Sequence, residues 1–155
     1  MKKTWKLIIS ILVPFVASAI GSLFTASSVS TWYPELQKPV FNPPSWVFGP
    51  VWTLLYLMMG IALYLVWAEK AKNKKPAFAA FGIQISLNAL WSVLFFGLQN
   101  PLLAFVEIIF LWFAIAATIA LFYRISKPAA YLMVPYILWV SFAALLNFSI
   151  FYLNM

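Results

Sequence analysis

The sequence predicts an all-α membrane protein: a bundle of five transmembrane helices with a structured, proline- and tryptophan-rich loop between the first two. The 155 residues are 65% hydrophobic and only 8% charged, with a mean hydropathy of +0.96. A soluble domain this small cannot bury so much apolar surface. The apolar residues form five continuous runs, each near the ~20 residues that span a bilayer. Continuous runs, unlike alternating ones, predict helices rather than barrel strands.

The five runs form one transmembrane domain, residues 1–155, in which we see no internal repeat. The first run follows Lys2, Lys3 and Lys6, as the core of a signal peptide would. It is longer than a signal core of 7–15 residues and lacks a clear small-residue cleavage site, so we interpret it as a retained helix. The helices are expected at about 7–28, 46–68, 76–98, 102–123 and 129–153.

Small residues recur at four-residue spacing in the first predicted helix, where Ala17 precedes Gly21 and Ser18 precedes Ser22. A second small-residue face lies between Ala114 and Ala120 in the fourth helix. Such faces allow another helix to approach closely. The spacing is compatible with a packing seam inside one chain, which we favour, and with a dimer contact.

The basic residues predict the orientation of the bundle. Nine of the ten lie at the N-terminus or in the second and fourth connections, and only Lys38 lies on the other side. The positive-inside tendency therefore places the N-terminus in the cytoplasm and the C-terminus outside, with the proline-rich loop also outside. The net charge of +7 is then a topology signal with some attraction for anionic lipid, and it implies no nucleic-acid partner.

The chain has no cysteine and no histidine. Disulfides, thiolate nucleophiles, Ser-His-Asp triads and the usual zinc or haem ligands are therefore excluded, and no metal site is expected. The acidic residues are only Glu35, Glu69 and Glu107, and no two of them lie close in sequence. Conventional hydrolytic or phosphoryl-transfer chemistry is not predicted. Glu107, near the outer end of the fourth helix, is expected to snorkel towards the interface and has no assigned role.

The segment from Trp32 to Tyr56 contains five prolines, three tryptophans and two tyrosines. Proline fixes φ and removes a backbone donor, so most of the segment is expected to be stiff and non-helical. One interpretation is a lid over an apolar cavity, and the alternative is a belt that anchors the loop in the headgroups. We favour the lid because the aromatic rings continue into the next span.

The eight tryptophans divide into two groups. Those at predicted helix ends are expected to form interfacial belts: Trp5, Trp32, Trp46 and Trp67. A belt does not explain the other four, which lie inside spans. Trp52, Trp91 and Trp139 are expected to line the outer half of one cavity. Trp112 has no polar neighbour at helical spacing and is expected in the core or facing lipid.

One face of the third helix carries Gln84, Asn88, Ser92 and Phe95, at steps of four, four and three residues. Amides within a span rarely face lipid; they face protein or a wet cavity. They are therefore interpreted either as helix-to-helix hydrogen bonds or as part of a pocket. For Gln84 and Asn88, grouped with Trp91 and Ser92, we favour the pocket.

The fifth helix repeats this spacing, while Asn147 and Asn154 lie on an adjoining stripe where we favour helix-to-helix bonds. The stripe that repeats it consists of Trp139, Ala143, Leu146 and Ile150. A cavity of indole rings and a few amides, without charge and with an aromatic cover, suits a large planar apolar ligand.

Three segments resemble the signature of the translocator proteins, also called tryptophan-rich sensory proteins or peripheral benzodiazepine receptors. They are WYPELQKPVFNPPSWVFGPVWTLLYLMMG (32–60), QISLNALWSVLFF (84–96) and PYILWVSFAALLN (135–147). The resemblance implies a five-helix bundle, often a homodimer, that binds porphyrins and other tetrapyrroles and synthetic isoquinoline or benzodiazepine ligands.

The residues of this sequence that match the family's motif positions imply a ligand pocket. The helical spacing on the third helix adds Ser92 to it. Trp52 and Trp139 would lie beside a porphyrin as participants in its light-dependent breakdown, with the porphyrin as ligand or substrate and with no cofactor. The implied pocket consists of Tyr33, Pro43, Pro44, Trp46, Trp52, Gln84, Asn88, Trp91, Trp139, Phe142, Ala143 and Leu146.

The leading expectation is therefore a membrane receptor for tetrapyrroles. The alternatives are an enzyme that degrades protoporphyrin IX under light and a transporter that moves tetrapyrroles across the membrane. Sterol binding is not inferred, because no basic residue follows Tyr152. The short form without a transit-like leader favours a bacterial cell membrane.

Overall fold

A computed structural model describes residues 1–155 and contains five long helices and no strand. All five are long and apolar enough to cross a membrane. The predicted fold class, an all-α integral membrane protein of five transmembrane helices, is therefore confirmed. The helices are α1 (Lys3–Ser28), α2 (Ser45–Ala68), α3 (Lys75–Ser92), α4 (Pro101–Tyr123) and α5 (Lys127–Leu153).

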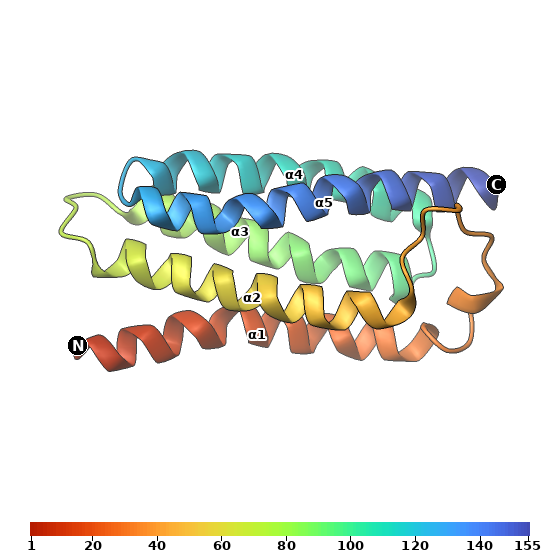
Figure 1. The fold of residues 1–155 in the computed structure, drawn as a ribbon, viewed down its shortest axis with the longest axis horizontal. Helices are drawn as coiled ribbons and strands as arrows, with labels where there is room; N and C mark the ends of the chain where they lie inside the picture. The colour runs from red at the N-terminus through yellow and green to blue at the C-terminus, as the bar shows by residue number, and fades with distance from the viewer.

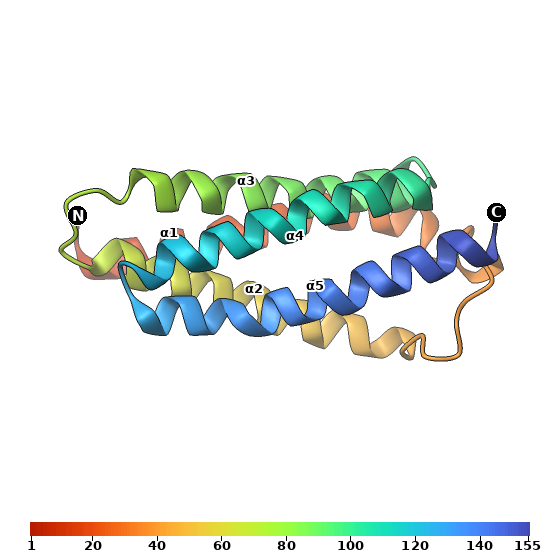
Figure 2. The same cartoon turned by 90° about the horizontal axis from the view of Figure 1, so that it is seen from above.

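The helices run side by side along one long axis, and the two termini lie at opposite ends of the bundle (Figure 1). The N-terminus shares its end with the α2–α3 and α4–α5 connections, which carry the basic residues. We call this the basic end. The opposite end carries the proline-rich loop and the C-terminus, and we call it the lid end (Figures 1 and 2).

Proline marks the first turn of three helices, at Pro76, Pro101 and Pro128. The missing N–H is harmless there, because the first turn has no intrahelical partner for it. The Asn100 side chain accepts a hydrogen bond from the Leu103 N–H (3.0 Å) and so caps α4. The observed boundaries lie within a few residues of those expected. Apart from the end of α3, the largest difference is at the start of α1, which begins at Lys3 rather than at 7, because polar residues extend the helix beyond its apolar run.

The third span departs from the expected single helix over 76–98. After Ser92 the chain widens into a π-helical segment, η2 (Val93–Gly97). This wider turn leaves the Phe96 carbonyl free to accept a hydrogen bond from Ser28 Oγ of α1 (2.6 Å). A Cβ on Gly97 would lie 2.8 Å from Phe24 Cδ1, so glycine permits this close approach of α1.

The half of the bundle at the basic end is tightly packed. Phe81 stacks on Phe122 with ring centroids 6.0 Å apart, which joins α3 to α4. The side chains with no exposed surface in this part of the core include Met59, Ala62, Val66, Ile115, Phe122, Ala129 and Met133. Close packing of this kind leaves the main cavity in the lid half.

Residues 29–44 form the lid, which includes the short 3₁₀ helix η1 (Tyr33–Glu35). The lid leaves α1, crosses to the C-terminal end of α5 and returns to α2 (Figure 1). Trp32 is half-buried and packs edge-on against Phe95, with centroids 5.6 Å apart. Trp32 was expected in an interfacial belt; it packs on the end of the bundle, and its place in a belt stays a prediction.

Candidate ligand-binding cavity

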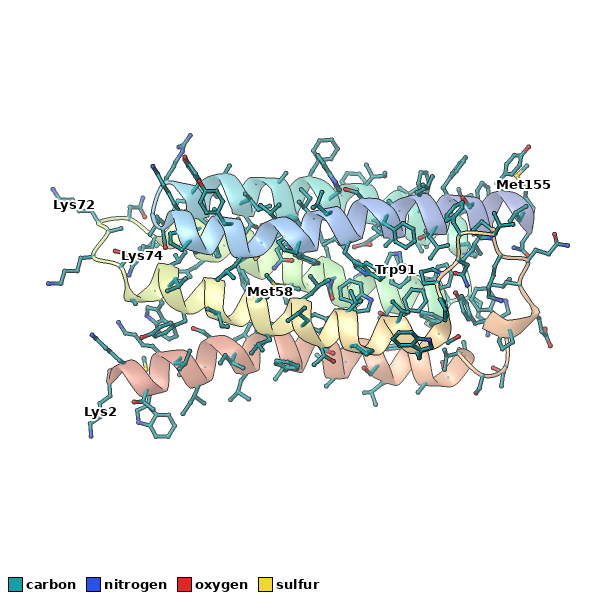
Figure 3. All side chains as sticks on the ribbon, in the orientation of Figure 1. Lys2, Met58, Lys72, Lys74, Trp91 and Met155 are labelled. Atoms are coloured by element: carbon teal, nitrogen blue, oxygen red, sulfur yellow. The ribbon has the colours of Figure 1, made fainter.

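A cavity of about 390 Å³ lies in the lid half of the bundle, and all five helices and the lid contribute to its wall. None of the residues that line it is charged. Trp91, labelled in Figure 3, lies among the aromatic side chains that gather in this half. The wall consists of Ser18, Gly21, Ser22, Thr25 and Val29 of α1 and its end; Tyr33 of the lid; Ser45, Phe48, Gly49, Trp52, Thr53 and Tyr56 of α2; Asn88, Trp91, Ser92, Phe95 and Phe96 of α3 and η2; Ile108 and Leu111 of α4; and Trp139, Val140, Ala143, Leu146, Asn147 and Ile150 of α5.

Two indole rings face the cavity from α2 and α5. Trp52 stacks on Tyr56, one turn further along α2, with centroids 5.5 Å apart and an interplanar angle of 28°. Trp139 of α5 packs edge-on against Phe48 of α2 at 6.0 Å. Each indole is held by a ring neighbour, so both present ordered aromatic surface to the cavity.

Trp91 is held by an aromatic stack and by a hydrogen bond. It stacks on Phe95 with centroids 4.9 Å apart and an interplanar angle of 18°. Its Nε1–H donates to Asn147 Oδ1 of α5 (2.9 Å), and Asn147 Nδ2 in turn donates to the Pro101 carbonyl of α4 (2.8 Å). The expectation that Asn147 bonds from helix to helix is confirmed. The amide thereby locks the ring that forms the α3 side of the cavity.

Tyr56 and Asn88 form the floor of the cavity, and a chain of buried polar side chains continues beneath them. Tyr56 donates its hydroxyl hydrogen to Asn88 Oδ1 (2.6 Å), and Asn88 Nδ2 donates to the Tyr136 hydroxyl (2.9 Å). Tyr136 donates to Gln84 Oε1 (2.9 Å), while Gln84 Nε2 lies 3.9 Å from Met59 Sδ. These bonds join α2, α3 and α5 below the aromatic wall. Buried polar groups must be paired in this way, and the pairing makes the floor rigid.

Tyr33 of the lid covers the cavity at its end. Its ring packs against Phe96 with centroids 5.7 Å apart, and Lys38 Nζ lies 4.5 Å from the ring centroid on the lid side. The Tyr33 hydroxyl donates to Asn42 Oδ1 at 3.4 Å. Burial raises the pKa of Tyr33 above 10.0, and the Asn42 bond offsets part of this rise. Tyr33 therefore presents a neutral phenol at the cavity under ordinary conditions.

The far side of the lid is fastened to the end of α5. The Gln37 backbone N–H donates to Asn154 Oδ1, and Asn154 Nδ2 donates back to the Gln37 carbonyl, both at 2.9 Å. Lys38 Nζ donates to the Leu36 carbonyl at 3.0 Å. Asn154 was expected to bond to another helix and instead clamps the lid. The amide oxygen and nitrogen of Asn154 pair with the backbone N–H and carbonyl of Gln37.

Two buried polar groups near the cavity have no hydrogen-bond partner. One is the Nε1–H of Trp139, whose side chain lines the wall. The other is Glu107 of α4, which is 6% exposed and whose two carboxyl oxygens are both unpaired. The expectation that Glu107 snorkels to the interface was therefore wrong, because its position on α4 turns the side chain into the bundle. An unpaired buried donor or acceptor is costly unless a ligand or water satisfies it.

Eight of the thirteen residues predicted for the pocket lie on the cavity wall. They come from the lid and from α2, α3 and α5, and so the structure brings together segments far apart in sequence. These eight are Tyr33, Trp52, Asn88, Trp91, Ser92, Trp139, Ala143 and Leu146.

The other five predicted pocket residues do not line the cavity. Gln84 is fully buried beneath the floor, because helical spacing gives its face but not its depth. Trp46 is 74% exposed at the start of α2. Phe142 packs between Trp139 and Phe41 of the lid, with centroids 5.4 and 6.3 Å away, and so supports the wall from behind. The remaining two, Pro43 and Pro44, lead the lid into α2 without reaching the cavity.

Several wall and floor residues were not predicted. Tyr56 lies four residues after Trp52, and Tyr136 lies three before Trp139, so helical spacing places each beside a predicted tryptophan. That signal was available in the sequence. The small residues of α1 were expected to form a packing seam: Gly21 packs with Ser92 Oγ 3.1 Å from the position of a Cβ, and Ala17 packs against the core. Trp112 was assigned no polar neighbour, but its Nε1–H donates to Ser141 Oγ of α5 (2.8 Å).

The wall offers aromatic faces, hydroxyls and amides. It carries no cysteine, histidine, aspartate or glutamate, and the chain contains no group of three or more such residues that could hold a metal ion. The arrangement can stack a planar ring, supply neutral hydrogen bonds and exclude water. It has no obvious general acid or base.

The fold and the cavity together define a class: a five-helix membrane protein with an uncharged, tryptophan-walled cavity beneath a proline-rich lid. The sequence profile of the TspO/MBR family matches residues 10–153. The chain belongs to this family.

Relatives span distant organisms. The chain is 50% identical over 149 residues to the tryptophan-rich protein TspO of Archaeoglobus fulgidus, an alignment that covers 96% of this chain and 97% of the relative. It is 38% identical over 142 residues to the translocator protein of Homo sapiens, with 90% and 84% covered. It is 34% identical over 155 residues to the tryptophan-rich sensory protein of Cereibacter sphaeroides, with 99% and 95% covered.

Proposed function

We propose that this protein is an integral membrane receptor that binds tetrapyrroles, porphyrins above all, in the cavity of the lid half. The observation that carries the proposal is the uncharged wall on which Trp52, Trp91 and Trp139 converge from three helices. Indole faces stack well on a large planar ring system. The volume of about 390 Å³ falls within the range of ~300–1,000 Å³ typical of ligand sites. Flat isoquinoline or benzodiazepine ligands fit the same description.

The unpaired Nε1–H of Trp139 supports the proposal. A porphyrin carries carboxylates on a flat apolar ring, and the synthetic ligands carry carbonyl groups, so each has an acceptor. A small rotation of the Trp139 indole would offer its donor to such an acceptor, which would remove the cost of a buried unpaired group. The apolar remainder of the ligand is stabilised by burial at ~25 cal/mol per Å².

Titration of protoporphyrin IX into the purified protein in detergent, followed by quenching of tryptophan fluorescence, tests the proposal. We expect Trp52→Phe combined with Trp139→Phe to weaken binding by about tenfold or more, since a lost indole contact costs ~0.5–1.5 kcal/mol. Trp5→Phe is the matched control, because Trp5 is 57% exposed at the basic end. Equal affinities for all three proteins, or no binding by the unmodified chain, would overturn the proposal.

A second candidate activity is light-dependent oxidation of bound protoporphyrin IX. It is favoured by the placement of Trp52 and Trp139 on the same cavity wall. Dioxygen is the oxidant: sensitised by the porphyrin, it adds both its atoms to a carbon–carbon bond of the ring, and the adjacent indoles intercept reactive products. The test is loss of porphyrin absorbance under light. The activity requires a loss that depends on dioxygen and disappears in each Trp→Phe variant while binding persists, and an equal loss with free tryptophan would refute it.

Transport of tetrapyrroles is the remaining alternative. The packed basic half weighs against a path through one protomer, because Met59 and Met133 have no exposed surface just beyond the floor. Vesicles that contain the protein are expected to take up protoporphyrin no faster than empty vesicles. Faster uptake that is lost in the Trp52→Phe, Trp139→Phe variant would establish transport in place of reception.

A further inference from the structure

Exposure is distributed unevenly around the cavity wall. The wall residues of α3, α4 and α5 are all buried or half-buried. The exposed ones come only from α1 and α2 and from the boundaries of these two helices with the lid. They are Ser22, Val29, Ser45, Gly49 and Thr53, and we call them the slot residues. The cavity therefore opens sideways, between α1 and α2.

The slot lies where the close contact of α1 and α2 near Gly60 gives way to open space at Gly49. A Cβ on Gly60 of α2 would lie 2.8 Å from Ile11 Cα of α1, so the two backbones are nearly in contact there. Gly49 lies about three turns nearer the lid. A Cβ added to Gly49 meets nothing within 4 Å.

In the lid half, α1 and α2 pack against different neighbouring helices. In the lid half α1 packs on the third span, where Ser28 Oγ donates to the Phe96 carbonyl at 2.6 Å. The lid half of α2 packs on α5, where Phe48 meets Trp139 at 6.0 Å. Because these contacts hold α1 and α2 apart, the slot is built into the packing of the bundle.

The end of the cavity, by contrast, is closed. Tyr33 lies over it, and the paired hydrogen bonds between Gln37 and Asn154 hold the lid against α5. A ligand that entered from the water at this end would have to break the clamp first. A ligand that entered from the side would not.

The chemistry of the slot suits passage of an apolar molecule. Of the slot residues, Ser22 and Thr53 donate their hydroxyl hydrogens to carbonyls of their own helices, both at 2.8 Å, and the neighbouring wall residue Thr25 does so at 3.1 Å. These three donors are therefore paired where they face the acyl chains, as the hydrocarbon region demands. The side chains are also short, so they leave room between the helices.

We infer that ligands reach the cavity laterally, from the lipid phase, through the slot between the lid halves of α1 and α2. This inference rests on the proposed function and narrows it. The ligands are molecules that dissolve in the bilayer and enter with the planar ring edge-on between two helices. Water-soluble compounds confined to the aqueous phase are outside this class.

A removable block in the slot tests the route. The chain has no cysteine, so Gly49→Cys gives one reactive thiol, which a bulky methanethiosulfonate reagent modifies and dithiothreitol restores. The modification is made after protoporphyrin IX has bound, and release into excess detergent or apo-myoglobin is followed by fluorescence. We expect release to slow by about tenfold or more and to recover on reduction.

Two controls make the result decisive. Gly82→Cys places the same reagent on an exposed face of α3 with open space around it, and it should leave the release rate unchanged. Asn154→Ala loosens the lid clamp and should also leave the rate within about twofold. Unchanged release after blocking at Gly49, or faster release from Asn154→Ala, would overturn lateral entry. Failure of the unmodified protein to bind protoporphyrin would instead refute the proposed function.

Discussion

Tyr136 is the residue on which the floor of the cavity depends. Its hydroxyl accepts from Asn88 Nδ2 and donates to Gln84 Oε1, and the side chain has no exposed surface. One oxygen thus satisfies two amides on α3. A tyrosine is suited to this position because its ring fills the core while its hydroxyl reaches across to α3.

We expect Tyr136→Phe to lower the stability of the folded protein by about 1–3 kcal/mol, because it leaves one amide donor and one amide acceptor unpaired in an apolar interior. Single helix-to-helix bonds in membranes average ~0.6 kcal/mol, and Tyr136→Phe removes two of them, so an effect near the lower end of this range is expected. Thermal unfolding in detergent measures it. Tyr131→Phe on the same helix, at a side chain that is 61% exposed, should unfold with the unmodified protein. Equal shifts in both variants would contradict this role of Tyr136.

Gly60 is the second residue at which we predict the effect of a substitution on stability. In Gly60→Ala the new methyl would lie 2.8 Å from Ile11 Cα, and a backbone atom cannot move aside as the tip of a side chain can. We expect a loss of about 1–3 kcal/mol from overpacking. Gly82→Ala meets nothing within 4 Å and should be neutral, or stabilising by up to ~1 kcal/mol through helix propensity. Chemical denaturation of both variants in micelles checks the pair, and a milder effect at Gly60 than at Gly82 would show that α1 and α2 separate freely.

Helical spacing predicted which residues share a face, and it did so well. The stripe of Trp139, Ala143, Leu146 and Ile150 lies entirely on the cavity wall. Spacing does not give depth, which is why Gln84 was assigned to the pocket and lies beneath its floor. Depth depends on where neighbouring helices bring their own large side chains, and a single helical pattern does not contain that information.

At the scale of elements, the third span contains a π-helical segment that its apolar run does not reveal. Hydropathy does not distinguish an α-helix from the π-helical segment at its end, because both bury the same side chains. The difference is in the backbone: the wider turn frees the Phe96 carbonyl, and Ser28 of α1 supplies its partner. The irregularity therefore depends on another helix far away in sequence and could not be predicted from residues 93–97 alone.

The lid is an element whose order is expected to depend on one side chain of another element. Asn154→Ala removes both bonds to Gln37, each worth ~0.5–1.5 kcal/mol. We expect the Gln37 amide hydrogen to exchange with solvent about tenfold faster as a result. Hydrogen exchange measured by mass spectrometry over residues 29–44 reports the change.

Ser149→Ala is the matched control for the lid clamp, because the Ser149 hydroxyl donates only to the Leu145 carbonyl of its own helix. Exchange in the lid should be the same as in the unmodified protein. If Asn154→Ala also left lid exchange unchanged, the proline-rich loop would be ordered by its own stiffness and its packing on Phe95 and Phe96.

At the scale of the whole molecule, composition and run length were sufficient to predict the fold class, since five continuous apolar runs leave helices as the only spanning form. The arrangement of the helices was not predictable in the same way. The small-residue pair of Ala17 and Gly21 was compatible with an internal seam or a dimer, and Gly21 packs on Ser92 within the chain. A homodimer stays a prediction, and its contact must lie on a face that the bundle leaves exposed.

The orientation of the bundle in the membrane is predicted from charge, because nine of the ten basic residues lie at one end. Since Lys and Arg resist translocation, the basic end is expected in the cytoplasm and the lid outside. The cysteine-free chain allows single-cysteine reporters at exposed sites, Val40→Cys in the lid and Lys72→Cys in the α2–α3 connection. In intact cells a membrane-impermeant maleimide should label Cys at 40 and reach Cys at 72 only after the membrane is permeabilised. Replacing Lys72 leaves eight basic residues at that end, so the bias persists. The opposite labelling pattern would place the lid in the cytoplasm, and the slot between α1 and α2 would then receive its ligands from the inner leaflet.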